Sequence, residues 1–123
     1  MSEPPSQFVL LHHVLPDGEH WDLCLDQGQT LATWQLLTYP SLQISQADPI
    51  PARRLADHRR AYLDYEGPVS GGRGHVTRVD RGTYVLLDRQ PDRWVVRLSG
   101  SVMIGTYEIA AIADSGLWNV YRT

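Results

Sequence analysis

Hydrophobic and polar residues alternate with a period of two along most of the 123-residue chain. Three early segments carry this pattern or are rich in strand-favouring residues, at 7–15, 20–26 and 30–37. Four more follow, separated by short turn-like pieces, at 74–87, 93–98, 101–112 and 117–123. Because short strands with regular turns between them are typical of antiparallel barrels and sandwiches, the pattern predicts an all-β protein. We expect a small antiparallel β-barrel with little helix.

The stretch from 39 to 74 breaks the alternation. It is rich in proline and glycine, and it carries a cluster of charged residues near its centre. This composition predicts a long central loop, with room for one short helix around 56–63. A loop of this length in a compact domain often has a functional role.

The length of the chain favours a single domain, which we place at 8–123 behind a flexible tail at 1–7. Cys24 is the only cysteine, so no disulfide can form within the chain, as is typical of a reducing compartment. The start of the chain lacks the pattern of a signal peptide, and no apolar run is long enough to span a bilayer. We therefore expect a cytoplasmic protein that has no membrane segment.

The charge balance is mildly acidic, with a formal net charge of −3 and no lysine. This argues against loose, non-specific binding of nucleic acid. Every fixed positive charge is an arginine, the residue suited to planar, two-pronged contact with a carboxylate or phosphate. A local arginine patch that binds phosphate is therefore compatible with the composition.

Metal-capable side chains gather near the start, in the stretch LHHVLPDGEHWDLCLD. In a strand, His20, Asp22 and Cys24 point to one face, which we expect to meet solvent or the mouth of a barrel. One of the two neighbouring histidines, His12 or His13, shares that side. Two histidines and a carboxylate make a three-ligand site suited to zinc, manganese or iron. The alternative is ordinary polar surface, since so short a motif recurs by chance.

The order of several motifs extends this picture. FVLLHH is followed by HWDLCLD, TWQL, ADHRRAYLDYEG and finally DRGTYVLL. Over almost the whole chain this order resembles the 3'-phosphoesterase domain of bacterial DNA ligase D, an end-joining repair enzyme. The resemblance implies a small β-barrel that removes a 3'-terminal phosphate or ribonucleotide from DNA ends. It also implies dependence on a metal ion, with manganese favoured and zinc as the alternative.

The resemblance assigns roles to individual residues. It places the metal ligands at His13, His20 and Asp22, so that His12 is surface. His58 and Tyr62 match the histidine and tyrosine that are associated with the phosphate in the family.

Two further motifs match the family without implying catalysis. Tyr65, Glu66 and Gly67 match a step that we interpret as structural, with Glu66 binding backbone. For Asp80, Arg81 and Gly82, a tight turn between strands explains the match.

The chain also departs from the family pattern. Cys24 replaces the arginine that grips the phosphate, Thr38 replaces a lysine, and Ala56 replaces a glutamate. Loss of one such preorganised donor costs about two to three orders of magnitude in rate. Among the arginines of the central stretch, which also include Arg59 and Arg73, we expect Arg54 or Arg60 to bind the substrate in its place.

Two functions therefore remain open. The chain is either a divergent metal-dependent phosphoesterase acting on DNA 3' ends, or a degenerate barrel that binds a metal or a nucleic-acid end without turnover. In the second case it would serve as a subunit beside DNA repair proteins. Retention of the three ligands with His58 and Tyr62 favours the enzyme.

Overall fold

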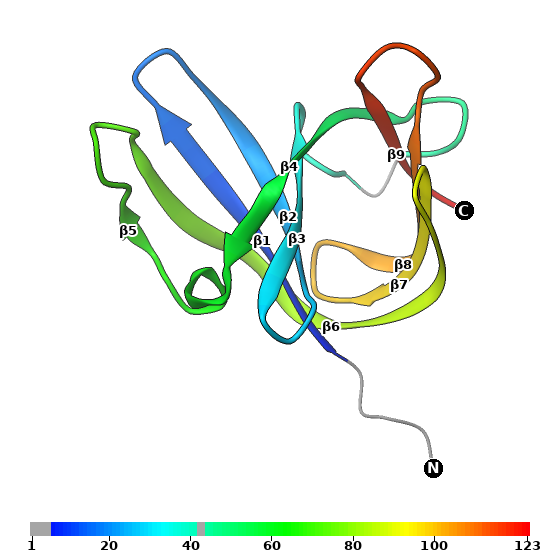
Figure 1. Ribbon diagram of the computed structural model, residues 1–123, viewed down its shortest axis with the longest axis horizontal. Coiled ribbons are helices and arrows are strands. Elements are labelled where there is room, and N and C mark those ends of the chain that lie inside the picture. Colours follow the sequence, from blue (N-terminus) through cyan, green and yellow to red (C-terminus); the bar gives the residue numbers. More distant parts are fainter. Residues whose placement is uncertain (1–5, 42–43) are drawn as a thin grey trace.

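The computed structural model describes residues 6–41 and 44–123, and within them most of the chain is strand (Figure 1). The strands are β1 (Ser6–Leu15), β2 (Gly18–Asp26), β3 (Thr30–Leu36), β4 (Ile50–Arg59), β5 (Gly67–Pro68), β6 (His75–Gln90), β7 (Arg93–Ser99), β8 (Ile104–Ala111) and β9 (Trp118–Arg122). A single turn of 3₁₀ helix, η1 (Arg60–Leu63), follows β4. The all-β prediction with little helix is confirmed.

The strands form one antiparallel sheet that closes into a ring. Its order is β1, β2, β3, β4, β9, β8, β7 and β6, and β6 pairs again with β1. The short β5 lies on the other side of the first residues of β6. Closure leaves most strands of the ring with a partner on each side, which limits association through unpaired backbone, whereas β4 beyond Ala52 pairs with β3 alone.

The main hydrophobic core fills the inside of this ring. Alternate residues of each strand point inward, and on β2 these are Leu23 and Leu25, both fully buried. Trp34 on β3 is the largest fully buried side chain among the described residues and packs edge to face on Trp94 and Trp118, with ring centroids 5.0 and 5.9 Å away. The alternation in the sequence therefore orients these strands correctly.

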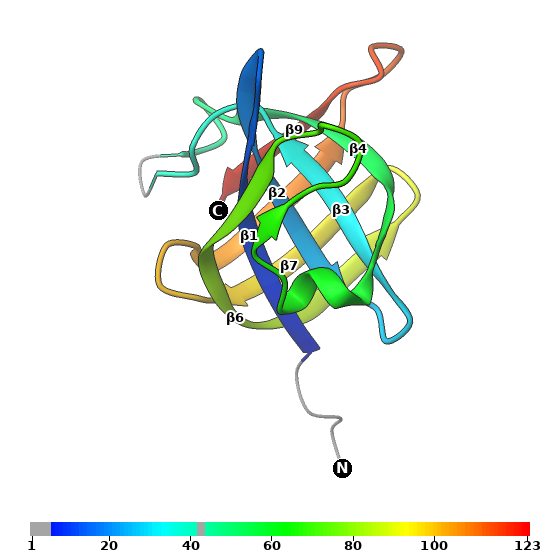
Figure 2. The same ribbon diagram turned by 90° about the vertical axis from the view of Figure 1, so that its left-hand side faces the viewer.

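A second, smaller cluster covers the outer face of β1, β2 and β3. It contains Val9, Leu11, Cys24, Leu31, Leu63 and Val76. Figure 2 looks onto this face and shows η1 and β5 in front of the three strands. Cys24 is fully buried here, so our expectation that it meets solvent or a barrel mouth is wrong. The reason is that η1 and the segment around Val69 cover this side of the strands.

Part of the stretch expected as loop forms a strand instead. Residues 50–59 make β4, which pairs with β3 along its length and with β9 at Ile50, Pro51 and Ala52. Ile50 and Ala52 are buried in the main core, and the carbonyl of Pro51 accepts a hydrogen bond from Leu37 N–H at 3.0 Å. Proline is tolerated here because it lies next to the first residue of the strand. Of the short helix expected around 56–63, only residues 60–63 are helical, as η1, whereas residues 56–59 belong to β4.

Asp80, Arg81 and Gly82 lie inside β6, so the expected tight turn is wrong. The buried Asp80 carboxylate accepts hydrogen bonds from the backbone N–H groups of residues 101, 102 and 103, at 2.8 to 3.0 Å. A side chain at Gly82 would meet the carbonyl oxygen of Ser99 at 2.2 Å. This motif therefore holds the β7–β8 connection against β6.

The beginning of the described chain is also ordered into the sheet. Ser6 and Gln7, which we assigned to the tail, belong to β1 and pair with Tyr84 and Thr83 of β6. The rest of the expected tail, 1–5, lies outside the described residues. No helix among the described residues is long and apolar enough to cross a membrane.

Candidate functional site

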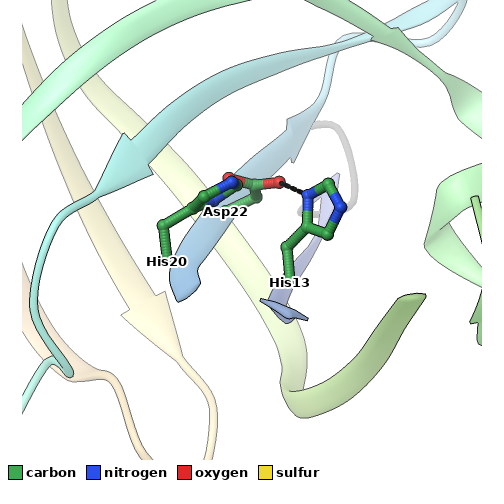
Figure 3. Close-up of side chains that lie close together, drawn as sticks. All are labelled: His13, His20 and Asp22. Atoms are coloured by element: carbon green, nitrogen blue, oxygen red, sulfur yellow. Dashed lines mark hydrogen bonds and ion pairs between the residues drawn. The ribbon is translucent and has the colours of Figure 1, made fainter. Parts of the chain in front are cut away.

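Three side chains converge on the outer face near the ends of β1 and β2. His13 and His20 are directly paired across the two strands, and Asp22 lies two residues further along β2 (Figure 3). The candidate ligand atoms of the three residues all lie within 4.8 Å of one another. This arrangement follows from strand pairing, because residues that face each other across two strands lie side by side on one face.

Hydrogen bonds hold the cluster in place. His20 Nδ1 donates to Asp22 Oδ1 at 2.8 Å, and His13 Nδ1 lies 3.8 Å from Asp22 Oδ2. On its other side, His13 Nε2 donates to the carbonyl oxygen of Arg73 at 2.6 Å. With its proton on Nε2, the His13 ring presents the lone pair of Nδ1 toward Asp22.

The donor set fits a divalent transition-metal ion. Two imidazoles and one carboxylate are the ligand types of catalytic zinc and manganese sites, which leave coordination positions open. The Asp22 side chain is only 3% exposed, whereas those of His13 and His20 are 15% and 12% exposed. A nearly buried carboxylate beside two partly exposed imidazoles suits an ion that is reached from solvent.

His12 lies outside this cluster. Its ring stacks on Trp21 with centroids 5.0 Å apart, and its Nε2 donates to Glu19 at 2.9 Å. The neighbouring histidines of β1 thus point to opposite sides of the strand, as alternation requires.

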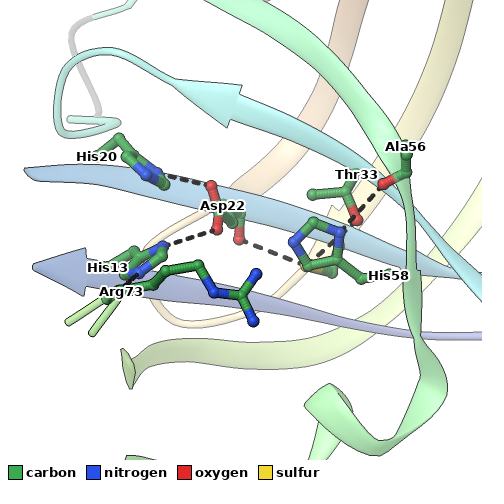
Figure 4. A network of polar contacts seen from close by, with 8 residues as sticks. His13, His20, Asp22, Thr33, Ala56, His58 and Arg73 are labelled. Carbon is green, nitrogen blue, oxygen red and sulfur yellow. Dashed lines mark hydrogen bonds and ion pairs between the residues drawn. The ribbon is translucent and has the colours of Figure 1, made fainter. Parts of the chain in front are cut away.

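A cavity of about 280 Å³ opens beside the cluster. His13 and Asp22 line one side of it, His58 and Tyr62 line another, and Leu11, Val69 and Val76 add apolar surface. His58 Nδ1 donates to the carbonyl of Ala56 at 3.1 Å, and Figure 4 shows its other ring nitrogen on the side of Asp22. The ring of Tyr62 contacts that of His58, with centroids 5.7 Å apart. The structure therefore brings five of the seven predicted site residues together in this cavity and the cluster beside it.

Arg54 and Arg60 do not line this cavity. Arg54 packs its guanidinium over Trp34, 4.3 Å from the ring centroid, at the end of the main core. Burial lowers the pKa of Arg54, whereas the nearby Asp57 opposes this effect. Arg60 forms a two-pronged ion pair with Asp26, both bonds being 3.0 Å long, and the Arg60 hydrogen bond lowers the pKa of that carboxyl.

Two other arginines, Arg59 and Arg73, line the cavity instead. Arg73 lies in the glycine-rich loop between β5 and β6, and Figure 4 shows its guanidinium between His13 and His58. The sequence signal was only its place in that loop, which does not tell which way an arginine points. Cys24 lies beneath the cavity, and burial raises the pKa of its thiol to about 12.

Residues 11–111 match the family model of the DNA ligase D 3'-phosphoesterase domain. The chain belongs to this family. Membership supports a 3'-phosphoesterase-like role in DNA repair, and the His–Asp cluster is a possible metal site within that domain. A search of curated proteins gave no match.

Proposed function

We propose that this DNA ligase D-type phosphoesterase domain removes a 3'-terminal phosphate or ribonucleotide from DNA ends, using a bound metal ion. The observation that carries the proposal is the shared cavity, in which His13 and Asp22 face His58 and Tyr62. Candidate metal ligands on one side of the cavity and polar side chains on another suit phosphoryl transfer, because that reaction depends mainly on positioning and charge.

The metal we propose is Mn²⁺, with Zn²⁺ as the alternative, held by His13, His20 and Asp22. The mixed donor set is compatible with both, because imidazole suits zinc and carboxylate suits manganese. When bound, the ion would polarise a phosphoryl oxygen or lower the pKa of a coordinated water. The carbonyl of Arg73 and the carboxylate of Asp22 would keep the two imidazoles in the orientation that this requires.

His58 is proposed to orient the phosphate and to exchange a proton with it. Because its Nδ1–H is held by the carbonyl of Ala56, Nε2 is the nitrogen available to the substrate. The hydroxyl of Tyr62 is a second donor on the same side of the cavity. In hydrolysis of a 3'-phosphate, water adds to phosphorus, the bond to the 3' oxygen breaks, and that oxygen leaves the cavity carrying a proton.

A second candidate function is a binding barrel without turnover. It is supported by the replacement of the family's arginine with the buried, uncharged Cys24, which provides no donor to a phosphate. Such a barrel would hold a metal or a DNA end for other repair proteins. For either function we propose the cytoplasm as the setting, consistent with an unpaired cysteine.

The test is a 3'-end release assay with metal-stripped protein that is reloaded with Mn²⁺ or Zn²⁺. The substrates are a DNA strand ending in a 3'-phosphate and one ending in a 3'-ribonucleotide. We expect turnover with the wild type and a loss of at least about 100-fold in His20→Ala, since a lost ligand costs more than a lost outer-shell partner. His12→Ala is the matched control, because it removes a neighbouring imidazole outside the cluster, and it should retain turnover.

Three outcomes separate the candidates. Turnover that survives in His20→Ala would reject the proposed metal site. Wild-type protein that binds Mn²⁺ without releasing either 3' group would favour the binding barrel. Turnover that disappears equally in His12→Ala would show that the assay reports damage to β1 and β2 rather than loss of a ligand.

A further inference from the structure

The cavity lacks the arginine that the family carries on the metal-binding strand. Its place is taken by Cys24, whose sulfur is buried and accepts a hydrogen bond from the Thr33 hydroxyl at 3.7 Å. A phosphate that enters the cavity would still need a positive partner, because its charge is costly to remove from water. The arginines that line the cavity are therefore the candidates for this role.

The loop that carries Arg73 is fixed onto β1. Val69 N–H donates to the carbonyl of Gly74 at 2.8 Å, which closes the loop. Gly74 has a φ of 77°, and a side chain there would meet the carbonyl oxygen of Val14 at 1.8 Å. Only glycine tolerates both the positive φ and this close approach to the strand. The loop therefore lies directly against the strand that carries His13.

The two halves of Arg73 contact different parts of the site. Its backbone carbonyl accepts the hydrogen bond from His13 Nε2. Its side chain turns into the cavity, where Nε donates to the carbonyl of Ser70 at 2.7 Å and one terminal nitrogen donates to the Ser70 hydroxyl at 3.3 Å. These two bonds hold the guanidinium plane in position and leave further N–H groups for an incoming oxygen.

Arg73 has no carboxylate partner within the described residues, unlike several other arginines of the chain. Arg60, Arg81 and Arg93 are each within 3.1 Å of a carboxylate. Among residues 6–41 and 44–123, no carboxylate lies within 4.0 Å of the Arg73 guanidinium; its two partners, both on Ser70, are neutral. Its positive charge is thus available to an anionic ligand in the cavity.

We propose that Arg73 grips the terminal phosphate in place of the arginine missing at position 24, while its backbone carbonyl orients His13 for the metal. This inference rests on the proposed function and adds the residue that recognises the phosphate. The side chain of Arg73 thus acts on the substrate, and its backbone carbonyl acts on the metal ligand His13. A mutation of the side chain can therefore test the first effect without removing the second.

The experiment compares binding of two fluorescent DNA strands that differ only in a 3'-phosphate or 3'-hydroxyl end, in chelator so that no turnover occurs. We expect wild type to prefer the 3'-phosphate, and Arg73→Gln to lose about 10- to 100-fold of that preference, the usual range for a charge-assisted hydrogen bond. Arg73→Lys keeps the charge without the planar fork and should fall between them. Arg97→Gln, an exposed arginine on β7 outside the cavity, is the matched control and should behave as wild type.

The second measurement is Mn²⁺ affinity by calorimetry. Arg73→Gln should stay within about twofold of wild type, because the carbonyl that orients His13 is retained. Gly74→Ala should lower Mn²⁺ affinity by about 10-fold or more, because it displaces that carbonyl from His13. A normal circular dichroism spectrum would confirm that this variant is folded; Arg73→Gln tests the phosphate contact independently of it.

The outcomes distinguish this inference from the proposed function. Wild-type protein that binds both strands equally would count against the proposed function itself. A wild-type preference that Arg73→Gln leaves unchanged would overturn the role of Arg73 alone. An equal loss in Arg97→Gln would also overturn it, since the effect would then reflect net charge rather than this contact.

Discussion

The two faces of β2 differ in what they contribute to the protein. On the inner face, Leu23 and Leu25 are fully buried among the side chains that fill the ring. On the outer face, His20 and Asp22 belong to the candidate metal cluster, and the buried Cys24 lies beneath the cavity. Along this one strand, alternate positions therefore serve stability and chemistry.

The candidate metal site and its cavity therefore rest on the outside of the closed sheet and take no part in the main hydrophobic core. The metal cluster and the cavity lie on the outer face, under η1, β5 and the glycine-rich loop. Because the two faces share only backbone, a change on one face should alter mainly the property that depends on it. The following variants test this separation.

Truncation on the inner face should have the largest effect on stability. Leu23→Ala removes a fully buried leucine from the main core and should lower the free energy of unfolding by about 2 to 5 kcal/mol. Urea denaturation measures this loss. Under conditions where the variant is folded, its Mn²⁺ affinity should equal that of the wild type, and a large change would contradict the separation of the two faces.

Change of the carboxylate on the outer face should remove the stabilisation that the metal provides. At a Mn²⁺ concentration about 100-fold above the dissociation constant, a bound ion should raise the free energy of unfolding of the wild type by about 2.7 kcal/mol. Asp22→Asn should lose this increment, because the amide is a poorer ligand than the carboxylate. Thermal unfolding with and without Mn²⁺ measures it, with His12→Ala as the control that keeps the response.

Change of the residue beneath the cavity should have the smallest effect. Cys24→Ala should cost about 1 kcal/mol of stability through lost packing, without loss of any 3'-end activity. Since burial raises the pKa of the thiol to about 12, the thiol is neutral near neutral pH and should resist alkylation by iodoacetamide in the folded protein. Rapid labelling of the native protein would show instead that the outer face opens readily.

Strand periodicity predicted much of this arrangement. The alternation in 20–26 by itself requires His20 and Asp22 on one side of the strand and Leu23 on the other, as they are in the fold. The same rule allows only one histidine of the pair at 12 and 13 to join them. These features were predictable because side-chain direction within a strand depends only on local geometry.

The features that sequence analysis missed depend on contacts between distant segments. β4 was not predicted because Pro51 and a run of charged residues interrupt the alternation typical of a strand. It forms a strand through its pairing with β3 and β9. Burial of Cys24 requires η1, which comes from the middle of the chain. The position of Arg73 depends on the close packing of Gly74 against Val14, which composition does not reveal.

The narrowest seam of the ring lies between β4 and β9. Only three residue pairs join them, at Ile50, Pro51 and Ala52 of β4. The two strands are far apart in the sequence, because four other strands lie between them. Closing this seam brings together distant parts of the sequence, a step that generally slows folding. Until β9 is in place, β4 and β8 expose unpaired edges that other chains can join. Slow formation of this short pairing would therefore prolong the time during which the folding protein can aggregate.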